Sequence, residues 1–205
     1  MNEIHLSGLI AQPIARRIRS WLEDGKLTED DLDRALTTDA RAHVEHSIGL
    51  ADWASLADVE GLVELASEQL GGETGLVEWA DDLVDDCRRD ERVADVLHAG
   101  VSLTDSPGFI VSQASSILLR DADWFYDGGR AAWSVRLAGI RDASSELKSL
   151  LGALLARLAD TSDGRDFDVR FEGVDRDDLV VFGEAPMRDD SDSESRLHQA
   201  ALIAS

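Results

Sequence analysis

The fold is decided between Ala131 and Phe182, where the sequence reads AAWSVRLAGIRDASSELKSLLGALLARLADTSDGRDFDVRFEGVDRDDLVVF. Apolar and polar residues alternate over 133–137, a pattern typical of a half-buried strand. Leucines at intervals of three and four then predict an amphipathic helix over 144–159. Alternation returns over 167–171, and 179–182 is a short apolar run. We therefore predict a strand–helix–strand–strand unit with one apolar side.

The preceding half of the chain carries mainly helical signals. The spacing of apolar residues predicts helices over 10–22 and 110–119, and Thr28 and Ser55 are suited to the N-cap positions of two more. Residues 37–52 show a less regular pattern. The predicted class is α+β, with a helical N-terminal half packed on a small antiparallel sheet that the leucine-rich amphipathic helix crosses.

Length and composition bound the domain organisation. The 205 residues suit one α+β domain over 1–187, followed by an acidic linker and a short C-terminal tail over 188–205. A single cysteine excludes an intramolecular disulfide. The N-terminus has no long apolar run of the secretory type, and no stretch is long enough to span a bilayer. We expect a cytoplasmic protein.

The charge is strongly negative, with 42 acidic against 20 basic residues and a net charge of −22. Such a field repels phosphate backbones and anionic lipids, so we expect neither a nucleic-acid partner nor a membrane partner. Two origins of the acidity remain open. It is typical of surfaces adapted to high salt, and it also suits attraction to a basic partner.

Few residues carry a chemical signal. His43 and His46 share a helical spacing that suits metal ligands, but nothing nearby completes a ligand set, so surface histidines are the preferred interpretation. Cys87 lies on an apolar helical face, which favours a buried structural thiol. No nucleophile is paired with a base in a recognisable motif. We therefore expect no enzymatic activity and no metal site.

An aromatic cluster precedes the first predicted strand. Trp124, Phe125 and Tyr126 come just before Asp127-Gly128-Gly129, which we interpret as a turn. The cluster lies where the apolar helix meets the sheet, so it suits the wall of a cavity between the two layers. The alternative interpretation is ordinary core between the layers.

Two polar residues of the first predicted strand, Ser134 and Arg136, project from the same face. In a cavity they would suit an acidic ligand, because the Arg guanidinium offers a fork of donors to a carboxylate. Facing solvent, they would have no special role. With this alternative open, the candidate ligand-binding residues include Trp124, Tyr126, Ser134 and Arg136.

The order of elements from Gly8-Leu9-Ile10 onward resembles the haem-nitric-oxide/oxygen-binding superfamily and the related 4-vinyl-reductase-type domains. The resemblance is closest to myxobacterial members of similar length. Their Arg, Tyr, turn and strand are matched here by Arg120 and by Tyr126 with the glycines that follow it. It covers residues 4–184 and implies a domain that binds a small molecule between helices and sheet.

The haem-binding members of this superfamily hold the propionates with a Tyr-x-Ser-x-Arg strand motif. Here Ala132 replaces the Tyr, whereas Ser134 and Arg136 are retained. The axial His of those members lies on the preceding buried helix, but 109–119 contains none, and His98 lies upstream. We retain His98 as a candidate ligand-binding residue and expect no bound cofactor, haem included.

Two functional hypotheses follow. The first is a non-enzymatic sensory or regulatory module that binds a small ligand, or has a degenerate pocket, between helices and sheet. The second is an adaptor or structural protein whose C-terminal tail docks into a groove of a partner. The unidentified partner is thus a small molecule or a protein, and a homodimer is compatible with both hypotheses.

Overall fold

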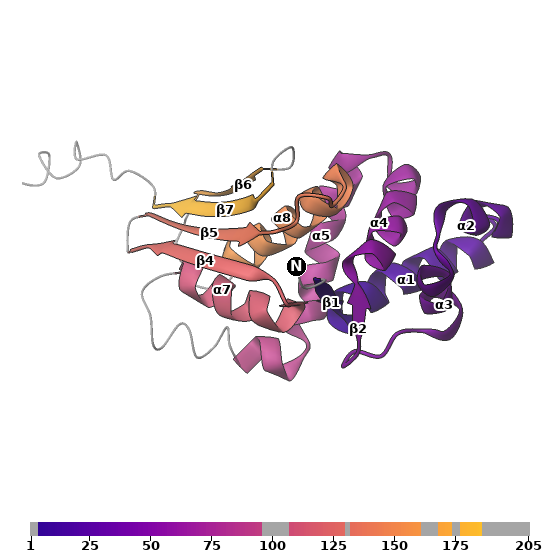
Figure 1. The fold of residues 1–205 in the computed structure, drawn as a ribbon, viewed down its shortest axis with the longest axis horizontal. Coiled ribbons are helices and arrows are strands. Elements are labelled where there is room, and N and C mark those ends of the chain that lie inside the picture. Colours follow the sequence, from indigo (N-terminus) through magenta and orange to yellow (C-terminus); the bar gives the residue numbers. More distant parts are fainter. Residues whose placement is uncertain (1–3, 96–106, 130–131, 161–167, 174–176, 186–205) are drawn as a thin grey trace, which may run out of the picture.

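The computed structural model describes residues 4–95, 107–129, 132–160, 168–173 and 177–185. The predicted α+β class is confirmed, because a helical N-terminal half packs against antiparallel strands (Figure 1). The predicted tail over 188–205 and the candidate His98 lie outside the described residues.

Helices dominate the first half of the chain. They are α1 (Gly8–Glu23), α2 (Glu29–Ala35), α3 (Thr38–His46), α4 (Leu56–Leu70) and α5 (Glu73–Arg88). The predicted N-caps are confirmed: the Thr28 hydroxyl accepts a hydrogen bond from the Asp31 amide, and the Ser55 hydroxyl accepts one from the Asp58 amide. Helix α4 ends at Gly71, which adopts a left-handed conformation with φ of 85°.

Helix α3 departs from the sequence interpretation, which found only a weak pattern over 37–52. The Thr37 hydroxyl caps this helix by accepting a hydrogen bond from the Ala40 amide at 3.0 Å. Only Ala40 and Val44 are buried along it. Two inward positions are too few to produce a visible helical period.

A small antiparallel sheet joins distant parts of the chain. It comprises β1 (His5–Ser7), β2 (Trp53–Ser55) and β3 (Leu119–Arg120), in the order β2-β1-β3. Leu6, fully buried, pairs with Ala54 on one side and Leu119 on the other. This sheet therefore links the beginning of α1 and the beginning of α4 to the end of α7 (Pro107–Leu118).

The larger sheet has four antiparallel strands. They are β4 (Asp123–Gly128), β5 (Ala132–Ala138), β6 (Asp168–Glu172) and β7 (Leu179–Glu184), in the order β4-β5-β7-β6. Strands β5, β6 and β7 match the predicted strands, and α8 (Ser145–Asp160) matches the predicted amphipathic helix. Strand β4 corrects the turn predicted at 127–129, because pairing with β5 extends to Gly128.

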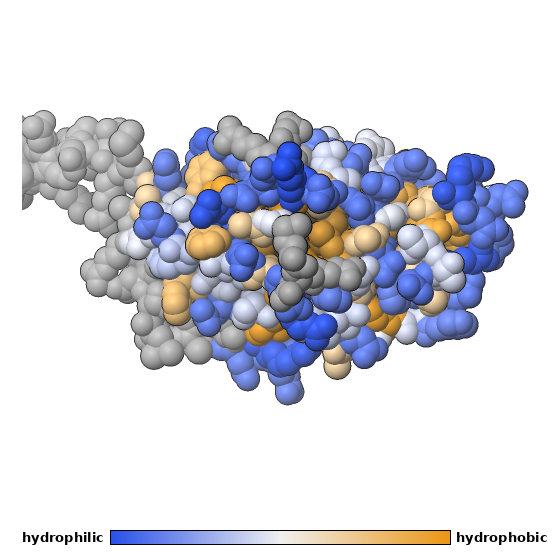
Figure 2. All heavy atoms as spheres, viewed as in Figure 1, coloured by the Kyte–Doolittle hydropathy of each residue, from blue (hydrophilic) through white to orange (hydrophobic). Residues whose placement is uncertain are grey.

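Helices α7 and α8 cover one face of the four-stranded sheet (Figure 1). Helix α7 contacts β4 and β5, whereas α8 contacts β6 and β7 and also packs on α4 and α5. Helix α8 is therefore buried around most of its circumference, with its leucines in the common core. The face of the molecule shown in Figure 2 is mostly hydrophilic, with small apolar patches between the charged side chains.

Trp133 joins α7 to the sheet. A Cβ atom placed at Gly183 would lie 2.5 Å from the Trp133 Cε2 atom, and one placed at Gly108 would lie 2.6 Å from its Cε3 atom. The indole is thus held in a slot between two glycines, and its side chain is 3% exposed.

Candidate functional site

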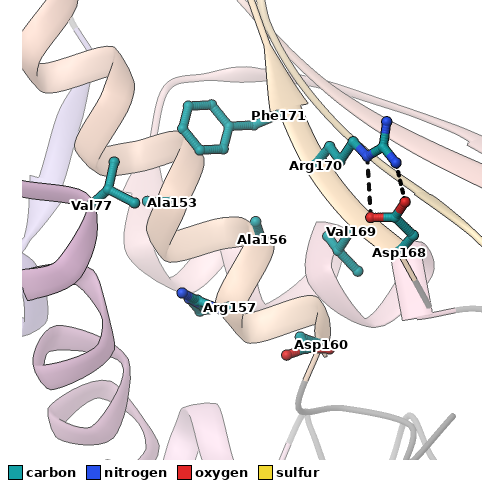
Figure 3. A pocket seen from close by; sticks show the side chains of 9 residues that line it. All are labelled: Val77, Ala153, Ala156, Arg157, Asp160, Asp168, Val169, Arg170 and Phe171. Carbon is teal, nitrogen blue, oxygen red and sulfur yellow. Dashed lines mark hydrogen bonds and ion pairs between the residues drawn. The ribbon is translucent and has the colours of Figure 1, made fainter. Parts of the chain in front are cut away.

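A cleft of about 500 Å³ lies where α5, α8 and β6 meet (Figure 3). Helix α5 contributes Val77, and β6 contributes Val169 and Phe171. The remaining wall is one stripe of α8, which includes Ala153 and Ala156. We call this space the α5–α8–β6 cleft. Its volume lies in the range of small-molecule sites, and its floor is apolar.

Small residues on α8 keep this cleft open. Ala153, beside Val77, and Ala156 line the cleft with side chains too small to fill it (Figure 3), and Gly152 carries no side chain at all. The ring of Phe171 lies against the backbone at Gly152, where an added Cβ would come within 2.7 Å of the Phe171 Cγ atom. Glycine at this position therefore sets how closely β6 approaches the helix.

Charged side chains form the rim of the cleft. Arg170 donates from Nε to the Asp168 carboxylate at 3.1 Å, and its Nη2 group contacts the other carboxylate oxygen (Figure 3). This hydrogen-bonded pair lowers the pKa of Asp168 and raises the pKa of Arg170. On the helical side, the Arg157 Nε atom lies 2.9 Å from the Oδ1 atom of Asp81 on α5. Both arginines of the rim are thus held in ion pairs at neutral pH.

Asp160 ends the rim and is the last residue of α8. Its side chain is exposed, and no ion pair links it to another residue in the described part of the chain. A carboxylate at a helix C-terminus faces the negative end of the helix dipole. This end of the cleft is therefore suited to a cation.

The sequence-predicted residues Trp124, Tyr126, Ser134 and Arg136 are divided between two faces of the sheet. Trp124 pairs with Leu137, which is buried under the helices, and the Tyr126 ring meets Phe109 of α7 edge-on at 6.0 Å. These two aromatic residues therefore lie on the helix-facing side, where both pack against the core between the layers.

Ser134 and Arg136 lie on the opposite, outer face of β5, because they alternate with the buried residues of that strand. The Arg136 guanidinium lies 4.5 Å from the Phe125 ring centroid and 3.2 Å from the Asp178 carboxylate. The alternative of a solvent-facing position thus holds for this pair. The four predicted residues do not line one common cavity.

The position of Ser134 and Arg136 shows whether the two retained residues of the strand motif could contact a haem between the layers. Haem held between the layers would need Ser134 and Arg136 to face the helices, and both face away. Helix α7 also carries no histidine over 109–118. The described residues therefore do not fit a haem between helices and sheet.

The inner aromatic layer holds two unsatisfied donors. The indole Nε1 groups of Trp124 and Trp133 are buried and have no hydrogen-bond partner among the residues that the structure describes. Buried polar groups of this kind are uncommon. They lie on the helix-facing side of β4 and β5, away from the Ser134–Arg136 pair.

The weaker chemical signals have structural explanations. His43 and His46 lie on α3, and no group of three or more His, Cys, Asp or Glu side chains suited to a metal ion occurs among the described residues. Cys87 is fully buried, and burial raises the pKa of its thiol to about 12. The structural interpretation of Cys87 is confirmed.

Sequence reasoning missed the α5–α8–β6 cleft. Its residues come from α5, α8 and β6, which lie far apart in the chain, and no motif marks them. The available signal was the pair Ala153 and Ala156, which interrupts the leucines of α8 with small side chains. Their position opposite an edge strand could not be deduced from spacing.

Comparisons with protein families and curated sequences give no match. No protein-family profile matches the chain, and no curated protein sequence matches it significantly. None of the helices in the described ranges is both long and apolar enough to cross a membrane.

Proposed function

We propose that this protein is a non-enzymatic regulatory module that binds its ligand in the α5–α8–β6 cleft. One observation carries the proposal: apolar side chains of the sheet and of the helices face one another across an open space. Phe171 and Val169 lie on the sheet side, opposite Val77 and Ala156 on the helical side (Figure 3). A ligand with an apolar body would cover these side chains and exclude water from both surfaces.

The charged rim suits recognition better than catalysis. A general acid or base works best when its pKa lies near the ambient pH. In the Asp168–Arg170 pair each partner favours the charged form of its neighbour. The pKa of Asp168 is therefore lowered and that of Arg170 is raised, so both move away from the ambient pH. Permanently charged groups can orient a polar ligand without exchanging protons with it.

The position of the cleft provides a route for regulation. Helix α8 packs on β6 and β7 on one side and on α4 and α5 on the other. A ligand between β6 and α5 would favour conformations with a particular spacing of sheet and helices, and a partner could read that spacing. The resemblance to sensory haem-nitric-oxide/oxygen-binding domains supports the same class of function, although the site differs.

Binding of the neutral fluorescent dye Nile red to the native chain tests the proposal. We expect saturable binding, which Ala156→Phe weakens about tenfold or more because the new ring occupies the cleft. Ala35→Phe on α2 is the matched control, since Ala35 is exposed and outside the cleft, and it should leave the affinity unchanged. Far-UV circular dichroism verifies that both variants are folded.

The same measurement distinguishes the cleft from the predicted tail. Removal of residues 188–205 should leave probe binding unchanged if the cleft is the site. Equal affinities for the native chain and Ala156→Phe would contradict the proposal, as would binding that appears only when the protein is partly unfolded.

A further inference from the structure

Strand β6 lies at one edge of the four-stranded sheet. In the order β4-β5-β7-β6 it pairs with β7, and it pairs with no other strand of the described residues. Along an edge strand, every second residue directs both its backbone N–H group and its C=O group away from the sheet. Such an edge is a template for a further strand.

The cleft follows this edge. Four consecutive residues, Asp168 to Phe171, line it. Side chains of neighbouring strand residues point to opposite faces, so a space bordered only by one face would contact every second residue. Contact with all four means that the cleft runs beside the β6 backbone.

Helix α8 provides a matching opposite wall. Its lining residues are Ala153, Ala156, Arg157 and Asp160, spaced as i, i+3, i+4 and i+7 on one face of the helix. From Ala153 to Asp160 the helix rises about 10 Å. The β6 segment that lines the cleft also spans about 10 Å. The groove between them is therefore as long as an extended segment of about four residues.

Charge indicates what kind of segment fits. Asp160 is exposed at the C-terminal end of α8 and has no ion-pair partner in the described part of the chain, whereas both arginines of the rim are already paired. The chain as a whole carries a net charge of −22. An incoming basic side chain would find a carboxylate at this end and a favourable field around it.

From these observations we propose that the α5–α8–β6 cleft takes an extended, basic peptide segment of a partner protein as a fifth strand beside β6. The inference rests on the proposed function and names the class of ligand. Apolar side chains of the peptide would cover Phe171 and Val169, its backbone would pair with the edge of β6, and a Lys or Arg would lie near Asp160.

The probe is a blocked synthetic peptide of about seven residues, Lys-Thr-Val-Thr-Val-Thr-Lys, which places both Lys side chains on the same face as the two Val side chains. We expect it to bind the native chain, to displace Nile red, and to slow amide hydrogen exchange within 168–172. Two matched peptides test backbone pairing: one is N-methylated on every Thr and the other on every Val and Lys. Because only alternate amides of a strand face its neighbour, one of them should lose binding and the other should retain it.

Charge reversal tests the role of Asp160. Asp160→Lys should weaken peptide binding about three- to tenfold, since an attraction at the protein surface becomes a repulsion. Glu23→Lys is the matched control. Glu23 is also an exposed acid and the last residue of its helix, α1, and it lies outside the cleft. It changes the net charge equally and should alter the affinity less than twofold.

The outcomes separate this inference from the proposed function. If Ala156→Phe abolishes dye binding but the peptide neither displaces the dye nor protects 168–172, the cleft is a small-molecule site and the peptide inference is wrong. Equal binding by both methylated peptides, or equal effects of Asp160→Lys and Glu23→Lys, would also overturn it. If neither dye nor peptide responds to Ala156→Phe, both proposals fail.

Discussion

Replacing Gly152 by alanine should have opposite effects with and without the Phe171 ring. In the native chain, a Cβ at position 152 would overlap the ring, with the Phe171 Cγ atom only 2.7 Å away. Displacing a packed side chain typically costs about 1–3 kcal/mol. Replacing a glycine inside a helix by alanine gains about 1 kcal/mol. We therefore expect Gly152→Ala to lower the free energy of unfolding by about 1 kcal/mol.

In a Phe171→Ala background the same substitution meets no ring. Phe171→Ala alone should cost about 2 kcal/mol, less than the loss of a fully buried ring, because Phe171 is only partly buried. Gly152→Ala should then raise the free energy of unfolding by about 1 kcal/mol, from helix propensity alone. The coupling energy between the two sites is thus about 2 kcal/mol.

Urea denaturation followed by far-UV circular dichroism measures all four chains, with equal m-values required for the comparison. Gly61→Ala on α4 is the control, because a Cβ there would approach the Ala35 carbonyl and not Phe171, and its effect should be the same in both backgrounds. The reasoning is refuted if Gly152→Ala stabilises the native chain, or if its effect does not depend on Phe171.

Three further predictions concern the cap, the thiol and the acidic surface. Ser55→Ala should lower the free energy of unfolding by about 1 kcal/mol in urea titrations, because the Asp58 amide loses its cap. Cys87, with a thiol pKa of about 12, should react with Ellman's reagent at pH 8 only at the rate of protein opening, and fast labelling of the native chain would contradict this. The Glu64 side chain is exposed, but partial desolvation and then the neighbouring Glu60 and Glu146 raise its pKa, so the folded state binds more protons and loses stability as the pH rises through that pKa. Glu64→Gln should raise the urea midpoint at neutral pH and leave it nearly unchanged at a pH below the usual carboxyl range.

The elements that the sequence predicts correctly are those with a long and regular apolar period. Helix α8 buries residues on nearly all sides, and its leucines recur over about three turns, from Leu147 to Leu158. Strand β5 alternates cleanly because one of its faces is covered by helices and the other is not. Strand β4 has the same alternation in its burial, but Asp127-Gly128 is a strong turn signal, and only its pairing with β5 extends the strand through these residues.

The candidate site shows a different limit. Alternation correctly placed Ser134 and Arg136 on one face of their strand, but it could not say which face the helices cover. That choice depends on the packing of α7 and α8, which bury Trp133 and its neighbours on the other side. The cleft depends even more on distant contacts, because Val77 and Phe171 meet only when α5, α8 and β6 pack together.

The packing of α8 also limits how a ligand could act. A helix buried against the sheet on one side and against α4 and α5 on the other cannot bend or rotate alone without opening voids in the core. The C-terminal half of α8, from Ala153 to Asp160, borders the cleft and faces an edge strand that is held in the sheet by β7. The element freest to respond is therefore β6, whose movement changes the width of the cleft and leaves the leucine core intact. A strand added beside β6 would stabilise one such position, so occupancy of the cleft and the distance between β6 and α8 would change together.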